Sequence, residues 1–256
     1  MTKTKEFSLA KGAKTLSFLV EPTGKGGYTY INEKLHRRGC RMPTFEELAW
    51  LGHEVFVNFN YLNLISGRKG IHEIREVFNS EKNILSSTMV LYSSKSKHGL
   101  KSGAYIIDNP EEIVGKIKLD GFQETEIAFE DFLERKVKES PEKSRFVNYG
   151  FKCENIVPEK IKDNRLCIGI AGKEGAKKLS ELAKMFDKLP SLSAFPRGNG
   201  ETDLRVARLR LFNGCEPYSR WLHIDCAGWD TSDSESRFDW IGAEGYTFGV
   251  RDYKLK

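Results

Sequence analysis

Long apolar runs are missing from this chain of 256 residues. No stretch approaches the roughly 18–20 consecutive apolar residues that a membrane-spanning helix requires, so we expect no such span. Residues 1–20 contain lysines but no uninterrupted apolar stretch before a small-residue cleavage site, and we expect no secretory signal peptide. Hydrophobic and charged contents of 39% and 30% indicate a soluble, globular protein that can bury a sizeable core.

Cysteine and histidine, which build many metal and catalytic sites, are scarce. The five cysteines show no CxxC spacing, so neither a zinc site nor a dense disulfide framework is expected. Buried free thiols are the simpler interpretation, and a disulfide between Cys215 and Cys226 stays open. No second histidine lies near His223, and the glycines at 24–27 lack the lysine and serine of a phosphate-binding loop. The sequence therefore predicts no catalytic residues, no metal and no cofactor.

Basic residues are also few where most of the tryptophans lie. Residues 213–245 contain seven acidic residues and two arginines, a net charge of −5, so the remainder of this +5 chain carries +10. Nucleic-acid sites place lysine and arginine beside their aromatic residues. Because three of the four tryptophans lie in the acidic stretch, we do not expect nucleic acid as a partner.

One helix can be predicted with a clear start. Thr44 and Glu47 form a T-x-x-E capping box, in which each side chain satisfies a backbone N–H of the first turn. We expect a helix over 44–60. Its apolar face, at helical spacing, consists of Phe45, Leu48, Ala49, Gly52, Val55, Phe56 and Phe59.

Other segments have patterns of strands, helices and turns. The strands are expected at 14–21, 87–94, 103–108, 113–119, 204–212 and 246–254. The helices are expected at 71–78, 127–140 and 174–188, and the glycines at 24–27 are expected to form a turn. We expect the strands at 14–21 and 246–254 to pair, with the 44–60 helix packed against them.

The stretch Trp221 to Trp240, "WLHIDCAGWDTSDSESRFDW", has neither the period of a strand nor that of a surface helix. It lies between two segments with strand patterns and is expected to be irregular. One interpretation is that Trp221 and Trp229 belong to a core over which a long loop folds. The other is that the segment forms a recognition surface.

Three local patterns resemble one family. "RRGCRMPTFEELAWLG" (37–52) resembles the G-x-R-L-P-T-E-x-E-W-E segment of C-type lectin folds of the formylglycine-generating-enzyme type, with Phe45 where an acid is usual. "GYTFGVRDYK" resembles the terminal strand of that fold, and "RLRLFNGCEPYSRW" resembles its L-R-G-G-S-W segment. The family's internal G-N-V-W-E-W motif is missing. The resemblance implies one α+β domain over 1–256, a C-type lectin fold with paired terminal strands and an insertion over 65–160.

Within this fold, the C-terminal pattern is similar to that of variable proteins of diversity-generating retroelements. In those proteins a segment is mutated en masse by error-prone copying at adenines, which scatters small and polar residues among fixed Trp, Arg and Gly. The resemblance implies a variable region over 205–251 and a non-catalytic protein that binds a ligand or receptor. The ligand-binding residues it implies are Tyr218, Arg220, Trp221, His223, Asp225, Trp229, Asp230, Ser232, Ser234, Asp239 and Trp240.

Two other functions of the same fold stay open. A formylglycine-generating oxidase would need reactive cysteines, and acidic neighbours of Cys215 and Cys226 would raise a thiol pKa rather than lower it. A calcium-dependent carbohydrate-binding lectin would need oxygen ligands around a hard cation, but "EPY" (216–218) lacks the asparagine of the usual E-P-N. The resemblance to the variable proteins implies a protein or glycan ligand, with a host-cell surface receptor as one candidate, and a virion or cell surface as a candidate location.

Overall fold

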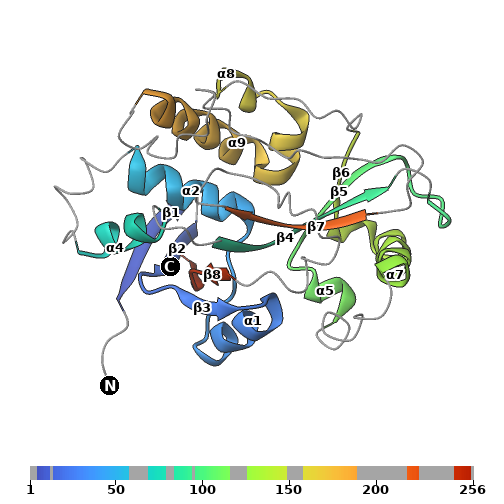
Figure 1. Cartoon of the computed structure of the whole chain (residues 1–256), viewed down its shortest axis with the longest axis horizontal. Coiled ribbons are helices and arrows are strands. Elements are labelled where there is room, and N and C mark those ends of the chain that lie inside the picture. Colours follow the sequence, from blue (N-terminus) through green and yellow to red (C-terminus); the bar gives the residue numbers. More distant parts are fainter. Residues whose placement is uncertain are drawn as a thin grey trace.

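The computed structural model describes residues 5–11, 14–57, 69–78, 84–93, 96–115, 126–148, 158–188, 218–224 and 245–254. This part of the chain combines helices with two β-sheets (Figure 1). The expectation of a mixed α and β protein is confirmed at that level, and the assignment to a C-type lectin fold stays a prediction. Among the described helices, none is both long and apolar enough to cross a bilayer.

The smaller sheet joins the two ends of the described chain. Its order is β1 (Glu6–Lys11), β2 (Lys14–Leu19) and β9 (Val250–Lys254), and both pairings are antiparallel. Phe18 pairs with Val250, and both side chains are buried. The predicted pairing of the first and last strand patterns is therefore confirmed.

The larger sheet is built around β4 (Ile84–Ser93). On one edge β4 pairs along most of its length with β7 (Tyr218–Ile224). The remaining strands follow the order β3–β8–β4–β5–β6, and they are β3 (Thr23–Gly26), β8 (Gly245–Thr247), β5 (Gly103–Asp108) and β6 (Arg145–Val147). β4 is thus the central strand of the larger sheet, because β5, β7 and β8 all pair with it.

Helices lie against both faces of this sheet (Figure 1). On one side, α2 (Phe45–Phe56), α4 (Lys69–Phe78) and α9 (Arg165–Lys188) share a hydrophobic core with Ile84 and Val90. On the other side, α1 (Tyr28–Arg37) and α7 (Glu126–Glu139) share a second core with Leu85, Met89 and Leu91. The shorter helices are α5 (Glu111–Val114), the 3₁₀ turn Pro141–Lys143 and α8 (Pro158–Ile161). Successive residues of β4 therefore enter opposite cores, as the pleat of a strand requires.

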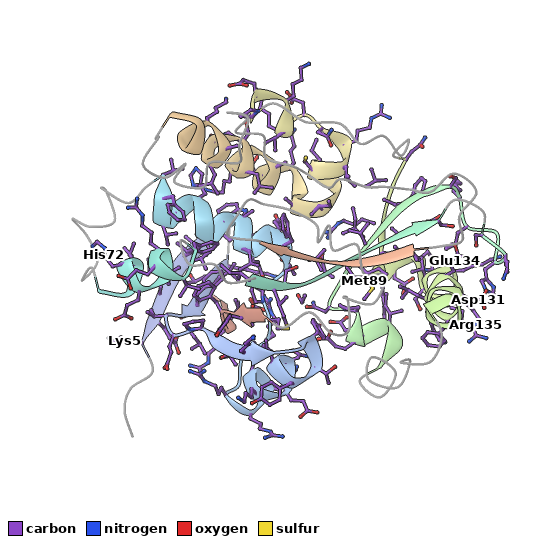
Figure 2. All side chains as sticks on the ribbon, in the orientation of Figure 1. Lys5, His72, Met89, Asp131, Glu134 and Arg135 are labelled. Atoms are coloured by element: carbon purple, nitrogen blue, oxygen red, sulfur yellow. The ribbon has the colours of Figure 1, made fainter. Side chains whose placement is uncertain are left out.

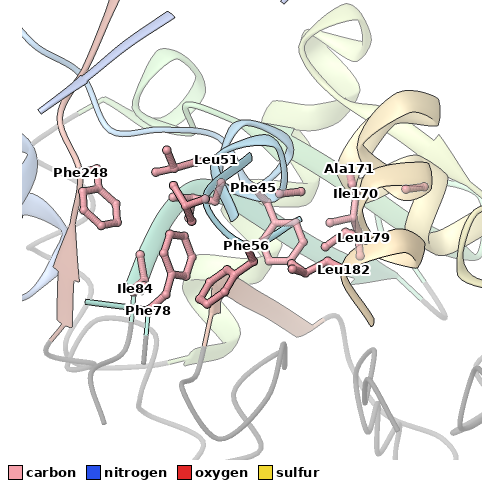
Figure 3. Close-up of a cluster of buried hydrophobic side chains, with 14 of the residues drawn as sticks. Phe45, Leu51, Phe56, Phe78, Ile84, Ile170, Ala171, Leu179, Leu182 and Phe248 are labelled. Carbon is pink, nitrogen blue, oxygen red and sulfur yellow. The ribbon is translucent and has the colours of Figure 1, made fainter. Parts of the chain in front are cut away.

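Helix α2 begins where the sequence predicts. Thr44 accepts a hydrogen bond from the Glu47 amide, and the Glu47 carboxylate accepts one from the Thr44 amide, so the capping box is present. The predicted apolar face is buried from Phe45 to Phe56 in the first core (Figure 3). The last residue predicted for that face, Phe59, lies outside the described residues.

Helix α9 crosses α2 closely because two glycines face it. A Cβ atom at Gly172 would lie 2.8 Å from the Glu46 Oε1 atom, and one at Gly175 would lie 3.0 Å from the Glu46 Cγ atom. Gly172 has a positive φ of 70° and bends the helix there. Arg145 donates to the carbonyls of Gly169 and Ile170, which belong to the last turn before the bend. The predicted 174–188 helix is the second half of α9.

Three sequence expectations are corrected. The strand expected over 246–254 is two strands in different sheets, β8 and β9. At the break, Gly249 accepts a hydrogen bond from the Leu19 amide, and a Cβ atom would lie 2.7 Å from Leu19 and 2.8 Å from Leu35. Only glycine fits where the chain passes from one sheet to the other.

The turn expected at the glycines 24–27 is instead the strand β3 followed by the N-terminus of α1. Gly24 pairs with Tyr246 of β8, whose ring leaves no room for a side chain there. The strand expected at 113–119 is wrong at its start, since Ile113 and Val114 belong to α5, which Pro110 precedes. Acidic residues at its first two positions favour this helical turn.

The middle of the chain contributes central elements. The described parts of 65–160 include α4, β4, β5 and α7, and the segments predicted as helices at 71–78 and 127–140 and as strands at 87–94 and 103–108 are confirmed. β4 and β5 are interior strands of the larger sheet. The interpretation of 65–160 as an insertion into a lectin scaffold stays a prediction.

Replacing Phe56 by alanine tests the first core. Phe56 is 5% exposed and packs edge-to-face on Phe78 at 5.9 Å between ring centroids, and Phe78 stacks in turn on Phe248. We expect Phe56→Ala to lower the free energy of unfolding by about 3–5 kcal/mol in urea denaturation. The neighbouring Val57→Ala, at a position 38% exposed, serves as control and should change it by less than about 0.5 kcal/mol. Equal effects of the two substitutions would contradict the packing described.

Candidate ligand-binding segment and its anchoring

Arg41 links the start of α2 to the closing strand β9. Its guanidinium donates two hydrogen bonds to the Glu47 carboxylate, both at 2.7 Å, and two to Asp252, at 2.9 and 3.3 Å. Its backbone forms a β-bridge with Val250 in both directions. A single planar side chain therefore holds together residues that lie more than 200 positions apart in the chain.

The charge of Arg41 is maintained by its partners. Burial alone lowers the pKa of Arg41, but the hydrogen bonds and charges of Glu47 and Asp252 outweigh burial and raise it above its ordinary value. Glu47 is itself part of the capping box of α2, so the same carboxylate caps the helix and pairs with Arg41. The R-x-P-T-x-x-E pattern in the sequence thus has a structural role that the geometry accounts for completely.

A bulge in β4 connects the larger sheet to the same helix terminus. The pairing of β4 with β7 is interrupted between Leu85 and Met89. Within this bulge the Ser87 amide donates to the Pro43 carbonyl, and the Thr88 hydroxyl accepts from the Phe45 amide. The Thr88 hydroxyl also donates to Asp108 of β5 at 2.6 Å. The bulge therefore fixes α2 against the sheet at the level where β7 pairs.

Four of the predicted ligand-binding residues lie on β7. Trp221 pairs with Met89, Arg220 with Val90 and Tyr218 with Tyr92, while His223 pairs with Leu85. The expectation that the segment is irregular from Trp221 onward is therefore wrong for 221–224. In sequence this strand is hidden because Ser219 and Arg220 interrupt its apolar residues.

These four positions of β7 belong to two different faces of the strand. Alternate residues of a strand belong to opposite faces, so Tyr218 and Arg220 share one face while Trp221 and His223 share the other. The structure thus brings the four together in one strand but not on one face. The remaining predicted residues lie outside the described part of the chain, and they are Asp225, Trp229, Asp230, Ser232, Ser234, Asp239 and Trp240.

Two polar clusters outside this segment were not predicted. At the contact of α2 with α9, His53 Nε2 lies 2.6 Å from Glu181 and His53 Nδ1 lies 3.2 Å from the Lys178 ammonium, which also donates to Glu54. His53 Nδ1 also lies 3.3 Å from the Glu54 carboxylate, so the histidine, the lysine and both glutamates form one polar cluster. The Lys178 ammonium also lies 4.3 Å from the centre of the Trp50 ring. These contacts join two helices distant in sequence, so no local pattern could have found them.

The second cluster surrounds a buried carboxylate on α7. Glu134 has no exposed surface and accepts hydrogen bonds from the hydroxyls of Ser93, at 2.5 Å, and Ser96, at 2.7 Å. Burial and the charge of Glu134 raise the pKa of Tyr105, although its hydroxyl donates to the Lys101 carbonyl. Figure 2 shows Glu134 and Asp131 on α7, beside the end of the sheet away from the termini. The first cluster pairs opposite charges between α2 and α9, whereas Glu134 accepts hydrogen bonds from two neutral hydroxyls, and we assign both clusters structural roles.

Two features of the described residues concern metal and thiol chemistry. Over these ranges, no group of three His, Cys, Asp or Glu side chains is placed to hold a metal ion. Cys40 and Cys167 are buried, and neither forms a disulfide bond. Cys215 and Cys226, which the alternative oxidase function would require, lie outside the described residues, as does the strand expected at 204–212.

Comparison of the chain with models of protein families, with curated proteins and with solved structures gives no match.

Replacing Arg41 by lysine tests the link between α2 and β9. A lysine keeps the charge but cannot donate to two carboxylates in the paired geometry of a guanidinium. We expect Arg41→Lys to lower the free energy of unfolding by about 2 kcal/mol in chemical denaturation. Arg37→Lys is the matched control, because Arg37 is 78% exposed and pairs only with Glu33 one turn away. Its effect should stay within about 0.5 kcal/mol. If Arg41→Lys is as mild, the link does not stabilise the fold.

Proposed function

We propose that this chain is a non-catalytic ligand-binding protein, a C-type lectin-fold variable protein of the kind found with diversity-generating retroelements. The observation that carries the proposal is the composition of 213–245 and its position. Tryptophans and an arginine are interleaved there with small polar residues, directly before the closing "FGVR". The proposed ligand is a protein or a glycan, with a host-cell surface receptor as one candidate, and no catalytic step is assigned.

The chemistry of the segment suits recognition. Rigid aromatic side chains supply contact area at low entropic cost, and serine, aspartate and glycine supply adaptable hydrogen bonds, as in antibody loops. Tyrosine, tryptophan and arginine are also the residues most often found at the energetic centres of interfaces. Function carried by a variable segment on a rigid scaffold is a common arrangement.

The scaffold contacts support the resemblance. The two segments that match the family at opposite ends of the domain touch each other through Arg41, whose backbone pairs with Val250 and whose side chain binds Asp252. The arginine and the glutamate of the motif both serve this one junction. The contact is what a closing strand paired to the start of the domain would require.

Two other functions of that fold are the alternatives, a formylglycine-generating-type oxidase and a calcium-dependent carbohydrate-binding lectin. The oxidase would rely on Cys215 and Cys226, and the lectin on the carboxylates of the acidic segment. Each makes a requirement that the proposed function does not, and each can therefore be tested separately.

The direct test of the proposal is to randomise the nine positions of the segment whose side chains we expect to point outward. The positions are Tyr218, Arg220, His223, Asp225, Asp230, Ser232, Ser234, Asp239 and Trp240. We expect most variants in such a library to keep their free energy of unfolding within about 0.5 kcal/mol, because exposed polar groups contribute little to stability. Selections of the library on immobilised proteins and glycans should recover different variants for different targets. A library in which most variants unfold would show that the segment is core and would refute the proposal.

The two alternative functions are tested by removing the cysteines or the metal ion that each would require. We expect the double substitution of Cys215 and Cys226 by serine, and treatment with EDTA, to leave the melting temperature nearly unchanged. Turnover of a cysteine-containing peptide by the wild type, lost in the double variant, would favour the oxidase. A large drop in melting temperature with EDTA would favour structural calcium. The neighbouring DNA offers an independent check, since a near-copy of the codons for 205–251 would mark a retroelement template.

A further inference from the structure

Glu111, the first residue of α5, is held by two neutral donors of α1. Its carboxylate accepts a hydrogen bond from the Tyr28 hydroxyl at 2.5 Å and a longer one from the Asn32 side-chain amide at 3.4 Å. Figure 1 shows α1 and α5 side by side. The Lys143 ammonium donates to the Glu112 carbonyl instead. Among the residues described, no lysine, arginine or histidine forms an ion pair with this partly buried carboxylate, so only neutral groups balance its charge.

The two donors come from the buried face of α1. Tyr28 and Asn32 are one helical turn apart and are buried together with Ile31 and Leu35, which belong to the second core. An asparagine is unusual at such a position, because it favours neither a helix interior nor a hydrophobic core. Asn32 is nevertheless only 4% exposed. A buried amide of this kind requires a partner at each end.

Only one end of the Asn32 amide has such a partner. The amide nitrogen donates to Glu111, and the reverse orientation would place two acceptor oxygens against each other, so the carboxylate fixes the orientation of the amide. The Oδ1 atom is buried and has no hydrogen-bond partner within the described part of the chain. Buried acceptors are nearly always satisfied, and each exception calls for an explanation. Asn32 therefore presents an acceptor beside Glu111 that the described fold does not use.

A second unpaired atom belongs to the strand residue that holds α5. The Ser87 carbonyl, in the bulge of β4, accepts a hydrogen bond from the Asn109 amide at 2.7 Å. The Asn109 carbonyl in turn accepts one from the Glu112 amide in the first turn of α5. Ser87 is 1% exposed, and its hydroxyl is likewise unpaired among the residues described. Both atoms thus belong to residues that hydrogen-bond to α5 or to the turn that begins it.

The arrangement suits one primary ammonium group. An ammonium has a single positive charge and three N–H donors, which match one carboxylate and an acceptor oxygen beside it. A calcium ion takes about 6–8 oxygen ligands. In the ranges described, no group of three His, Cys, Asp or Glu side chains is placed to hold a metal ion. Glu111 is only partly buried, so a ligand can approach it from solvent.

A guanidinium fits this carboxylate less well. It would donate to both carboxylate oxygens side by side, but Glu111 Oε2 already accepts from Tyr28. Burial and the charge of Glu111 raise the pKa of Tyr28 well above its ordinary value, so the hydroxyl stays protonated and keeps donating. One carboxylate oxygen and the Asn32 carbonyl therefore remain for a compact cation.

We propose that Glu111 and Asn32 form a binding site for a primary ammonium group, carried by a small free amine or by a lysine side chain of a partner protein. The Glu111 carboxylate supplies the charge, and the Asn32 carbonyl oxygen supplies a second acceptor. Both residues lie outside the segment 205–251, so the site does not depend on the proposed function.

Titration of the full chain with methylammonium chloride tests the site, followed by NMR through the backbone amide signals of α1 and α5. Tetramethylammonium chloride at equal concentration is the control, because it has the charge but no N–H donor. We expect saturable shifts with methylammonium alone. Glu111→Gln should weaken binding by at least about tenfold, whereas Glu112→Gln, at the exposed neighbouring carboxylate, should change it by less than about twofold. No saturable binding, or equal effects of the two substitutions, would overturn the proposal.

Replacing Asn32 by leucine separates a ligand site from a purely structural one. Leucine leaves no unpaired oxygen in the core, so Asn32→Leu should keep or raise the melting temperature while methylammonium binding is lost. A lower melting temperature with unchanged methylammonium binding would show that the oxygen serves only the fold, and would overturn the proposal.

A peptide distinguishes the two sources of the ammonium group. The probe is an acetylated and amidated Gly-Lys-Gly tripeptide, and its trimethyl-lysine form, which has no N–H donor on the side chain, is the control. Tighter binding of the lysine peptide than of methylammonium would assign the site to a protein partner, and the reverse order would assign it to a free amine. Equal binding of the lysine and trimethyl-lysine peptides would overturn the proposal.

Discussion

The paired hydrogen bonds of Arg41 to Glu47 and Asp252 are the constraint on which the rest of the architecture depends. These hydrogen bonds fix the N-terminal end of α2 relative to the strand β9. The backbone pairing of Arg41 with Val250, the first residue of β9, adds to this link. α2 in turn supplies the apolar face of the first core. An arginine suits this place better than any other cation, because its planar donors satisfy two carboxylates at once and its charge is not lost on burial.

The second organising feature is the burial of β4 on both faces. Its residues enter the two cores alternately, and its edges pair with β5, β7 and β8. Most strands of an antiparallel sheet leave one face to solvent, which gives them a visible alternation of polar and apolar residues. A strand covered on both faces gives an apolar run instead, and "ILSSTMVLYS" shows one only in part, because its serines and threonine form the bulge that binds α2.

Features set by neighbouring residues were predictable from the sequence, and features set by distant contacts were not. The capping box and the apolar face of α2 are local, so their sequence pattern was sufficient. The break between β8 and β9 was missed because the space that excludes a side chain at Gly249 is made by Leu19 and Leu35, far away in the chain. β7 was not predicted, since its strand conformation depends on the edge that β4 offers. The His53 cluster had no sequence signal, because half of it comes from α9.

Gly249 also has an evolutionary consequence. The segment 205–251 includes this glycine, and on either side of it Phe248 and Val250 are almost completely buried. Every missense change of a glycine codon adds a side chain, and here any side chain would press against Leu19 of the smaller sheet and Leu35 of α1. A mutational process that reached this codon would lose most of its products to misfolding. If the chain is diversified as proposed, we therefore expect the variation to end before Gly249, with this glycine kept constant among related sequences.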